Sequence, residues 1–342
     1  MDTREVFVAE PELAHRRVRA PRLAIGFSRS HPRHCVLYRQ RMRIVSLLPA
    51  ATEIVAALGR LDDLVGVSHE CDFPTAVNEK PRVTRCAIHG NRLPSAEIDR
   101  WVRTELRSTG TLYTMDEALL RELAPDVILT QRLCDVCAVG YGSVVALAAT
   151  LPGSPRVVNL EPMRLGDVFQ DVLNVGAAIG ASDAAAGVVS ALHARVNAVK
   201  RRTSSLPRRR CVLLEWIDPP YRTGHWGPDL VTAAGGADLL AIAGSPAAAV
   251  PWEAVREARP EVLAIACCGF DVARTMDDVP LLRKASGWDE LPAVQHNEVW
   301  LLDGTIHVSR PGPRLADTVE LLAQCLHPDV FGAPETPDVV RV

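Results

Sequence analysis

Four short apolar runs in this sequence each end in a loop that carries histidine, cysteine or acidic side chains. Residues 64–68 lead to His69, Glu70 and Cys71; residues 126–130 to Cys134 and Cys137; residues 211–214 to Glu215, Asp218, His225 and Trp226; and residues 262–266 to Cys267 and Cys268. If the runs are parallel strands, the loops lie at the carboxyl ends of sheets, where open α/β sheets bind ligands. The pattern predicts one pocket that gathers groups from distant parts of the chain.

The Cys134-x-x-Cys137 pair lies between a strand-like run and a helix-like segment, and three interpretations of it stay open. It is a redox pair if the start of the helix lowers the pKa of a thiol. It is part of a zinc or iron site if Cys71 and Cys268, from other loops, help to complete a set of about four ligands. Otherwise both thiols only line an apolar cleft.

Two histidines and two tryptophans suit a flat ligand with a metal at its centre. The imidazoles of His69 and His225 are candidate axial ligands to cobalt in a corrinoid or to iron in a haem. Trp226 and Trp252 offer ring faces on which such a macrocycle stacks. The alternative for each histidine is a hydrogen bond to nearby backbone, and for each tryptophan a place in the core.

Acidic side chains of the same loops extend the predicted ligand site. Glu70 directly follows His69 and faces the same predicted cleft. Glu215 and Asp218 are candidates either to polarise a ligand amide or to orient His225. The alternative for this second pair is to cap the loop at residues 219–220.

Two arginines flank the expected start of the last long helix. Arg310 is placed to pair with a carboxylate or phosphate of the ligand, and for Arg314 we favour a salt bridge within the protein. Glu53 follows Thr52 at the start of the first predicted helix, where an acidic residue suits the positive end of the helix dipole. We therefore expect Glu53 to stabilise a helix end.

Composition describes an ordinary globular protein. The chain has 342 residues, of which 48% are hydrophobic and 23% charged, and this length favours two domains. The net charge of −3 does not indicate binding to nucleic acid or to an anionic membrane. No apolar stretch approaches the roughly 20 residues that cross a bilayer, so we expect no direct membrane insertion.

The first 41 residues differ from the rest, with nine arginines and four acidic residues. This composition predicts that residues 1–41 are a disordered extension, or that translation naturally starts at Met42. We find no secretory signal and no lipoprotein motif there, so we expect a cytoplasmic protein. In that compartment the nine cysteines are not expected to form a disulfide framework.

The remaining residues alternate strand-like and helix-like segments. Residues 42–160 predict one α/β lobe, residues 207–330 a second, and residues 331–342 a loose tail. Between the lobes, residues 161–206 carry apolar positions at helical spacing, including one helix of about 20 residues that starts near Ser182. Such a long helix predicts a rigid connector, so the lobes should move little.

Several short motifs in the same order resemble the cobalamin and iron-siderophore substrate-binding proteins of bacterial ABC importers. The motifs are residues 43–53, 64–67, 123–128, 234–236 and 310–314. The resemblance implies a class III periplasmic-binding-protein-like fold, with two Rossmann-like lobes and a ligand held between them. The absence of an export signal, together with residues 68–72 and 134–137, resembles a non-secreted subgroup named for cobalamin binding.

The resulting prediction is a monomeric binding protein for a small molecule, a corrinoid or related metal chelate, that performs no chemistry on it. The first alternative is a cytoplasmic enzyme, metal-dependent or thiolate-based, that uses the same side chains. The second alternative is an ABC-importer component with a permease partner. We do not favour the permease, because a cytoplasmic protein cannot reach the outer face of a transporter.

Overall fold

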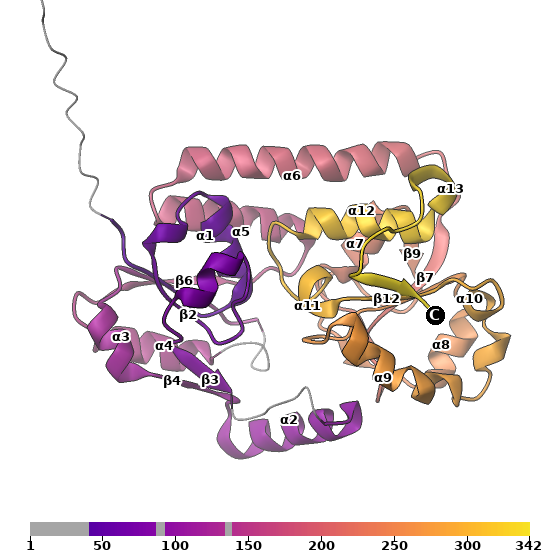
Figure 1. The fold of residues 1–342 in the computed structure, drawn as a ribbon, viewed down its shortest axis with the longest axis horizontal. Helices are drawn as coiled ribbons and strands as arrows, with labels where there is room; N and C mark the ends of the chain where they lie inside the picture. Colours follow the sequence, from indigo (N-terminus) through magenta and orange to yellow (C-terminus); the bar gives the residue numbers. More distant parts are fainter. Residues whose placement is uncertain (1–40, 87–92, 134–138) are drawn as a thin grey trace, which may run out of the picture. The chain divides into compact units, whose positions relative to one another are not determined.

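The structure is a computed structural model of the chain and describes residues 41–86, 93–133 and 139–342. Residues 41–342 form one compact unit that contains two α/β lobes (Figure 1). Within the described residues, no helix has both the length and the apolar character that crossing a membrane requires.

The N-terminal lobe is built on a four-stranded parallel sheet with strand order β2-β1-β5-β6. Its strands are β1 (Ile44–Ser46), β2 (Leu64–Val67), β5 (Val127–Gln131) and β6 (Arg156–Leu160). Its helices are α1 (Pro49–Ala57), α3 (Glu117–Leu123) and α4 (Tyr141–Ala148), with 3-10 turns η1 (Leu61–Asp63) and η2 (Thr75–Glu79). Consecutive residues of β1 enter different cores, Ile44 on one face and Val45 on the other. The sheet is therefore buried on both sides, which explains why its strands are almost wholly apolar.

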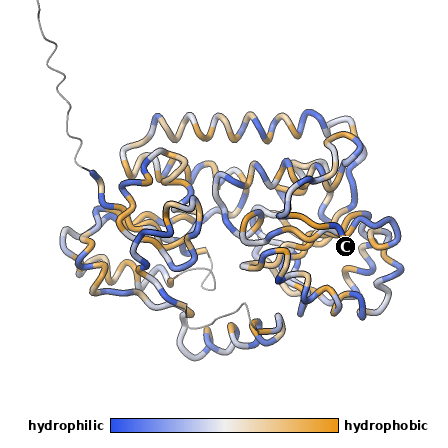
Figure 2. Tube along the Cα trace, in the orientation of Figure 1, coloured by the Kyte–Doolittle hydropathy of each residue, from blue (hydrophilic) through white to orange (hydrophobic). Residues whose placement is uncertain are grey.

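The C-terminal lobe has a seven-stranded mixed sheet with the path β10-β8-β7-β11-β12-β13, and β9 also pairs with β7. Its strands are β7 (Arg209–Trp216), β8 (Tyr221–Arg222), β9 (Gly236–Asp238), β10 (Ala248–Ala249), β11 (Val262–Ile265), β12 (Val299–Leu302) and β13 (Val339–Arg341). Its helices are α7 (Gly227–Ala233), α8 (Trp252–Ala258), α9 (Val272–Arg283), α10 (Pro292–Gln295), α11 (Gly304–His307), α12 (Leu315–Leu326) and α13 (Pro328–Phe331), with η4 (Trp288–Glu290). Figure 2 shows hydrophobic residues concentrated along the strands.

The end of the chain corrects one prediction. Residues 331–342 are not a loose tail throughout, because β13 pairs antiparallel with β12 and Leu301 faces Val340 in the register. Val339 is 7% exposed and belongs to the core of the lobe. Three residues of alternating pattern at a chain end are too short a signal to be recognised as a strand.

Two helices connect the lobes, α5 (Leu165–Ala178) and α6 (Ser182–Thr203). In α5, Val168 packs in the C-terminal core and Val175 in the N-terminal core. In α6, Ala185 packs in the N-terminal core and Val196 in the C-terminal core. The 22 residues of α6 extend about 33 Å at 1.5 Å per residue. The predicted long helix is confirmed, and both helices hold the lobes together along their length (Figure 1).

The lobes have a third connection, which the sequence did not predict. Strands β3 (Thr84–Cys86) and β4 (Tyr113–Met115) pair antiparallel away from the main sheet, and α2 (Ser95–Thr109) lies between them in sequence. Gly110 ends α2 with a φ of 71°, the left-handed conformation that glycine adopts readily. We call β3, α2 and β4 together the arm.

Candidate functional site

The N-terminal half of the site follows β2. The backbone N–H of His69 donates to Thr84 Oγ1 at 3.1 Å, and the ring Nδ1 lies 2.8 Å from the same oxygen. The ring also packs against Tyr113, with 5.4 Å between ring centroids. Burial, followed by the charge of Arg82, lowers the pKa of His69, so the imidazole is neutral at pH 7. If Nδ1–H donates to the hydroxyl, the lone pair on Nε2 is available to a ligand metal.

Glu70 lies beside this ring on the same loop. Its Oε1 is 3.9 Å from His69 Nε2, and its side chain is 44% exposed. Loss of hydration raises the pKa of Glu70, while the charge of Arg310 and a hydrogen bond with Tyr113 oppose the rise. A shallow pocket at this position is lined by Leu47, Ser68, His69, Glu70, Thr84, Tyr113 and Val139.

Cys71 lies inside the N-terminal core rather than in the pocket. It is 1% exposed, and its Sγ is 3.1 Å from Thr52 Oγ1 and 3.2 Å from Ser68 Oγ. Burial raises the pKa of the thiol, which favours the protonated form. Cys71 thus fills and hydrogen-bonds the base of the loop, and its predicted part in a metal site with Cys134 and Cys137 stays a prediction, because that pair lies outside the described residues.

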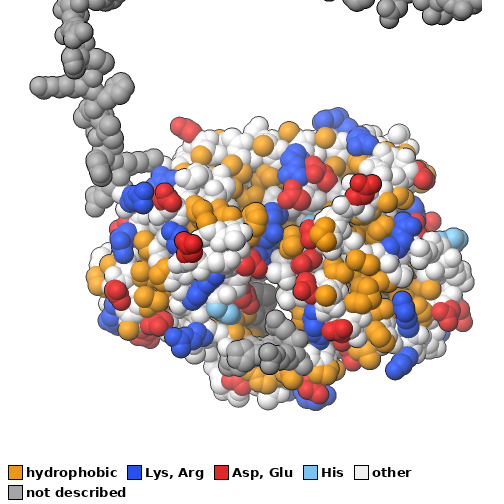
Figure 3. Space-filling view, viewed as in Figure 1, with side chains coloured by type: hydrophobic (Ala, Val, Ile, Leu, Met, Phe, Trp, Pro, Cys, Tyr) orange, Lys and Arg blue, Asp and Glu red, His pale blue; other side chains and the backbone are white. Residues whose placement is uncertain are grey.

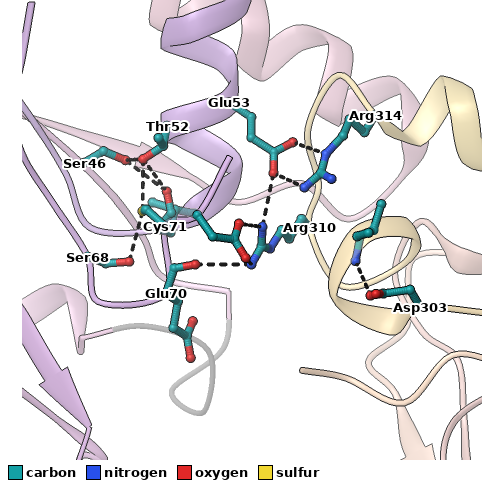
Figure 4. A network of polar contacts seen from close by, with 12 residues as sticks. Ser46, Thr52, Glu53, Ser68, Glu70, Cys71, Asp303, Arg310 and Arg314 are labelled. Atoms are coloured by element: carbon teal, nitrogen blue, oxygen red, sulfur yellow. Dashed lines mark hydrogen bonds and ion pairs between the residues drawn. The ribbon is translucent and has the colours of Figure 1, made fainter. Parts of the chain in front are cut away.

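Buried ion pairs join the two lobes next to this loop (Figure 4). The Arg310 guanidinium donates to both oxygens of Asp72, at 2.5 and 3.1 Å, and to the backbone carbonyl of Glu70 at 3.2 Å. Glu53 accepts from Arg314 Nε at 2.8 Å and lies 3.5 Å from Arg310. The side chains of Glu53 and Arg310 are only 3% and 9% exposed.

This network corrects two predictions and confirms a third. Arg310 is not free to pair with a ligand anion, because protein carboxylates already occupy its guanidinium. Glu53 does not cap α1, whose N-cap is Leu48 without any side-chain bond. The salt bridge predicted for Arg314 is confirmed, and its partner is Glu53.

The C-terminal half of the site begins at the end of β7. Burial raises the pKa of Glu215 to about 7, and the backbone of Gly224 and the charge of Arg222 act against the rise. His225 has a φ of 48°, and its backbone N–H donates to Ser245 O at 2.6 Å. Burial also lowers the pKa of His225, which leaves that imidazole neutral. The carbonyl of Asp218 accepts from the indole of Trp216 at 3.1 Å.

Both predicted stacking tryptophans are packing residues instead. Trp226 is 8% exposed within the C-terminal core, and its indole N–H donates to Val308 O at 2.9 Å. Trp252 lies against Trp288, with ring centroids 6.0 Å apart, and donates to Ser286 O at 2.9 Å. Trp226 is thus enclosed in the core, whereas Trp252 is half-buried and packs on Trp288, and backbone carbonyls satisfy both indole N–H groups.

The predicted metal cluster is only partly visible. Cys134 and Cys137 lie outside the described residues, so the redox, metal and cleft-lining interpretations of that pair stay predictions. Cys268 is exposed in the loop after β11. Across residues 41–86, 93–133 and 139–342, no group of three or more His, Cys, Asp or Glu side chains is positioned to hold a metal ion.

Figure 3 shows a hollow between the lobes, with acidic and basic side chains around it. His69 and Glu70 come from the N-terminal lobe, and Glu215, Asp218 and His225 from the other. That the side chains of both lobes face this hollow remains a prediction. Sequence reasoning missed Thr84 and Tyr113, which position His69 and Glu70, because strands β3 and β4 span three residues each and pair across the intervening α2.

Two α/β lobes joined by paired helices define the class of two-lobed binding proteins with a helical backbone. A family model described as "Periplasmic binding protein" matches residues 44–305, and the chain belongs to this family. The family resemblance and the two-lobed fold predicted from the sequence are thereby confirmed.

Individual relatives agree with this assignment. The chain is 25% identical over 300 residues, 86% of this chain and 82% of the relative, to YvrC of Bacillus subtilis, named an uncharacterized ABC transporter substrate-binding lipoprotein. The vitamin B12 binding protein BtuF of Vibrio cholerae aligns with a TM-score of 0.59 and 21% identity, over 83% of this chain and 96% of BtuF. A periplasmic heme binding protein from Pseudomonas aeruginosa aligns with a TM-score of 0.66 and 18% identity, over 88% and 97%.

Proposed function

We propose that this protein is a substrate-binding protein that takes a metal-chelate macrocycle into the cleft between its lobes. The family supports the binding role, and the similar structures named for vitamin B12 and heme support the ligand class. The protein captures the ligand without reacting with it. Among such ligands we favour a corrinoid over a haem.

The observation that carries the proposal is the environment of His69. Its ring is neutral at pH 7, and Thr84 Oγ1 holds Nδ1 at 2.8 Å. A second group that holds one imidazole nitrogen orients the other toward a metal and makes it a better ligand. The side chain is 26% exposed, so part of it is accessible to solvent.

The charges favour a corrinoid, whose side arms are largely neutral amides, over a haem, whose propionates are anionic. Glu70 contributes an acidic group beside His69, and Glu215 and Asp218 are the acidic groups of the other half. Arg310, whose charge acts on Glu70, is already paired with Asp72. A carboxyl whose pKa is about 7, such as that of Glu215, is partly protonated and can donate to an amide carbonyl.

The test is a visible-light titration of the purified protein with aquacobinamide, aquacobalamin and haem. We expect tightest binding of a corrinoid, with a spectral shift when an imidazole replaces a coordinated water. His69→Ala should abolish the shift, whereas His225→Ala reports on the other lobe. His296→Ala is the matched control, because that exposed ring bonds Pro292 O and is not among the residues that line the pocket at His69. Identical spectra for wild type and His69→Ala would remove axial ligation from the proposal.

A second proposal concerns the cellular setting. The name of the Bacillus relative favours an ABC-importer component with a permease partner. The sequence prediction of a cytoplasmic location leads instead to an intracellular carrier. Cell fractionation, with co-purification of a permease from the membrane fraction, separates the two: a cytosolic protein without permease refutes the importer role, and a membrane-associated complex refutes the carrier.

A further inference from the structure

The arm connects the lobes on a different side of the molecule from α5 and α6. In Figure 1, α6 runs along the top of the view, and α2 lies at the bottom, apart from both main sheets. Ile98 of α2 is 8% exposed and is buried in the C-terminal core cluster together with residues of β7 and β11. Trp101 and Leu106 of the same helix pack on the N-terminal core. The helix therefore touches both lobes.

Polar contacts fasten the beginning of α2 to the C-terminal lobe. Arg274 of α9 donates to Leu93 O at 2.7 Å and to Asp278 at 3.0 Å. The hydroxyl of Ser95 donates to the same carboxylate, which is on a residue only 6% exposed. We call Ser95, Arg274 and Asp278 the latch.

A further bond lies one helical turn along. The phenol of Tyr221, on β8, donates to Asp99 Oδ1 at 3.0 Å. Asp99 is on α2 and Tyr221 on the opposite lobe, so this contact also crosses between them. Two separate elements of the C-terminal lobe, α9 and β8, thus hold the same helix.

The other end of the arm reaches the candidate ligand residues. Thr84 of β3 bonds the His69 ring, and Tyr113 of β4 packs on that ring and bonds Glu70. In the β3–β4 register Thr84 faces Met115, and Cys86 faces Tyr113. A displacement of the arm therefore moves groups that orient His69 and Glu70.

We propose that the arm is a strap across the ligand cleft, which must leave the latch for a ligand to enter or depart. This inference rests on the proposed ligand site between the lobes. Because α5 and α6 run through both cores, the lobes cannot open widely about them. The arm is joined to the C-terminal lobe by the buried side chain of Ile98 and by side-chain hydrogen bonds, which together break at lower cost than two helices packed in both cores. Binding at His69 and Glu70 acts on the arm through Thr84 and Tyr113.

The first test measures the latch without any ligand. Hydrogen–deuterium exchange is compared for wild type, Asp278→Ala and the control Arg283→Ala, an exposed residue in the last turn of the same helix. We expect faster exchange in residues 95–109 of Asp278→Ala alone, by about tenfold, the effect of losing hydrogen bonds to a charged group. The strands β5 and β11 should keep their protection. Unchanged exchange in residues 95–109 overturns the strap.

A milder variant covers the case in which Asp278→Ala does not fold. Ser95→Ala with Tyr221→Phe removes one bond from each of two anchoring elements and leaves no buried charge unpaired. Its exchange should rise in residues 95–109 in the same direction. A rise spread evenly over all helices would mean general destabilisation and would overturn the strap as well.

The second test uses aquacobinamide in stopped-flow mixing. Both the association and dissociation rate constants should rise about tenfold in the latch variant, and their ratio should change much less. Local loosening of α2 with unchanged rate constants overturns the gating role. If wild type does not bind aquacobinamide or the other chelates at all, the proposed function fails, and the exchange experiment alone then decides whether α2 is latched.

Discussion

Replacing Glu53 by glutamine should destabilise the protein strongly. This carboxylate lies between the guanidiniums of Arg310 and Arg314 and is only 3% exposed. The amide keeps the shape of the side chain and removes its charge. Both guanidiniums, whose side chains are 9% and 16% exposed, then lose a buried counterion. Asp72 stays as a partner of Arg310, but its side chain is 56% exposed.

The expected loss follows from burial. Breaking a buried ion pair by removing one partner costs about 3–5 kcal/mol, because the remaining charge is left unpaired away from water. The matched control is Glu320→Gln, which removes a carboxylate bonded to Arg195 at 2.6 Å. The two side chains of that pair are 44% and 39% exposed. An exposed pair contributes about 0–1 kcal/mol, so burial predicts a several-fold difference between two chemically identical substitutions.

Equilibrium unfolding in urea, followed by circular dichroism, gives the free energy of unfolding for wild type and both variants. Thermal unfolding should agree, with a fall in Tm of about 1.5 °C for each kcal/mol in a chain of this size. Equal and small losses in the two variants would refute the view that the interlobe network is a buried, stabilising contact. A large loss in Glu320→Gln would refute the use of burial to rank the two pairs.

Three further outcomes are expected. Burial raises the pKa of Glu215 from its ordinary 4.5 to about 7, so between these pH values the folded state binds more protons than the unfolded state. The free energy of unfolding should therefore fall as the pH rises from about 4.5 to about 7. Urea titrations at several pH values should find this slope reduced in Glu215→Gln. Maleimide labelling read by peptide mass spectrometry should modify Cys268 well before Cys71, and equal rates would contradict the burial of Cys71. Trp226→Phe should lower the free energy of unfolding by about 1 kcal/mol through loss of its bond to Val308 O, yet leave chelate titrations unchanged; weakened binding would return Trp226 to the ligand site.

The elements that were predictable from sequence carry their signal locally. The strands at residues 64–67 and 127–131 are apolar runs bounded by turns, and α6 has apolar residues at helical spacing followed by Lys200 and two arginines. Such patterns hold wherever the segment lies in the fold. By contrast, strands β3, β4 and β13 span three residues each, and only pairing with a strand distant in sequence makes them strands.

The site residues show the same difference between local and long-range information. His69 was placed near a sheet edge by its position after an apolar run, which is local information. The partner of Glu53 is Arg314, 261 residues away, and nothing in the neighbouring sequence distinguishes such a carboxylate from a helix cap. Trp226 and Trp252 were misassigned for a similar reason, because a tryptophan in a loop has the same sequence appearance whether it meets a ligand or the core.

The two connecting helices have a consequence for the integrity of the molecule. Each of them contributes apolar side chains to the hydrophobic cores of both lobes, so neither lobe has a complete core without them. A fragment that stops after residue 160, or one that starts at 207, would carry an open apolar surface where α5 and α6 had been. The halves are therefore not interchangeable modules, and we expect residues 41–342 to unfold as one cooperative unit.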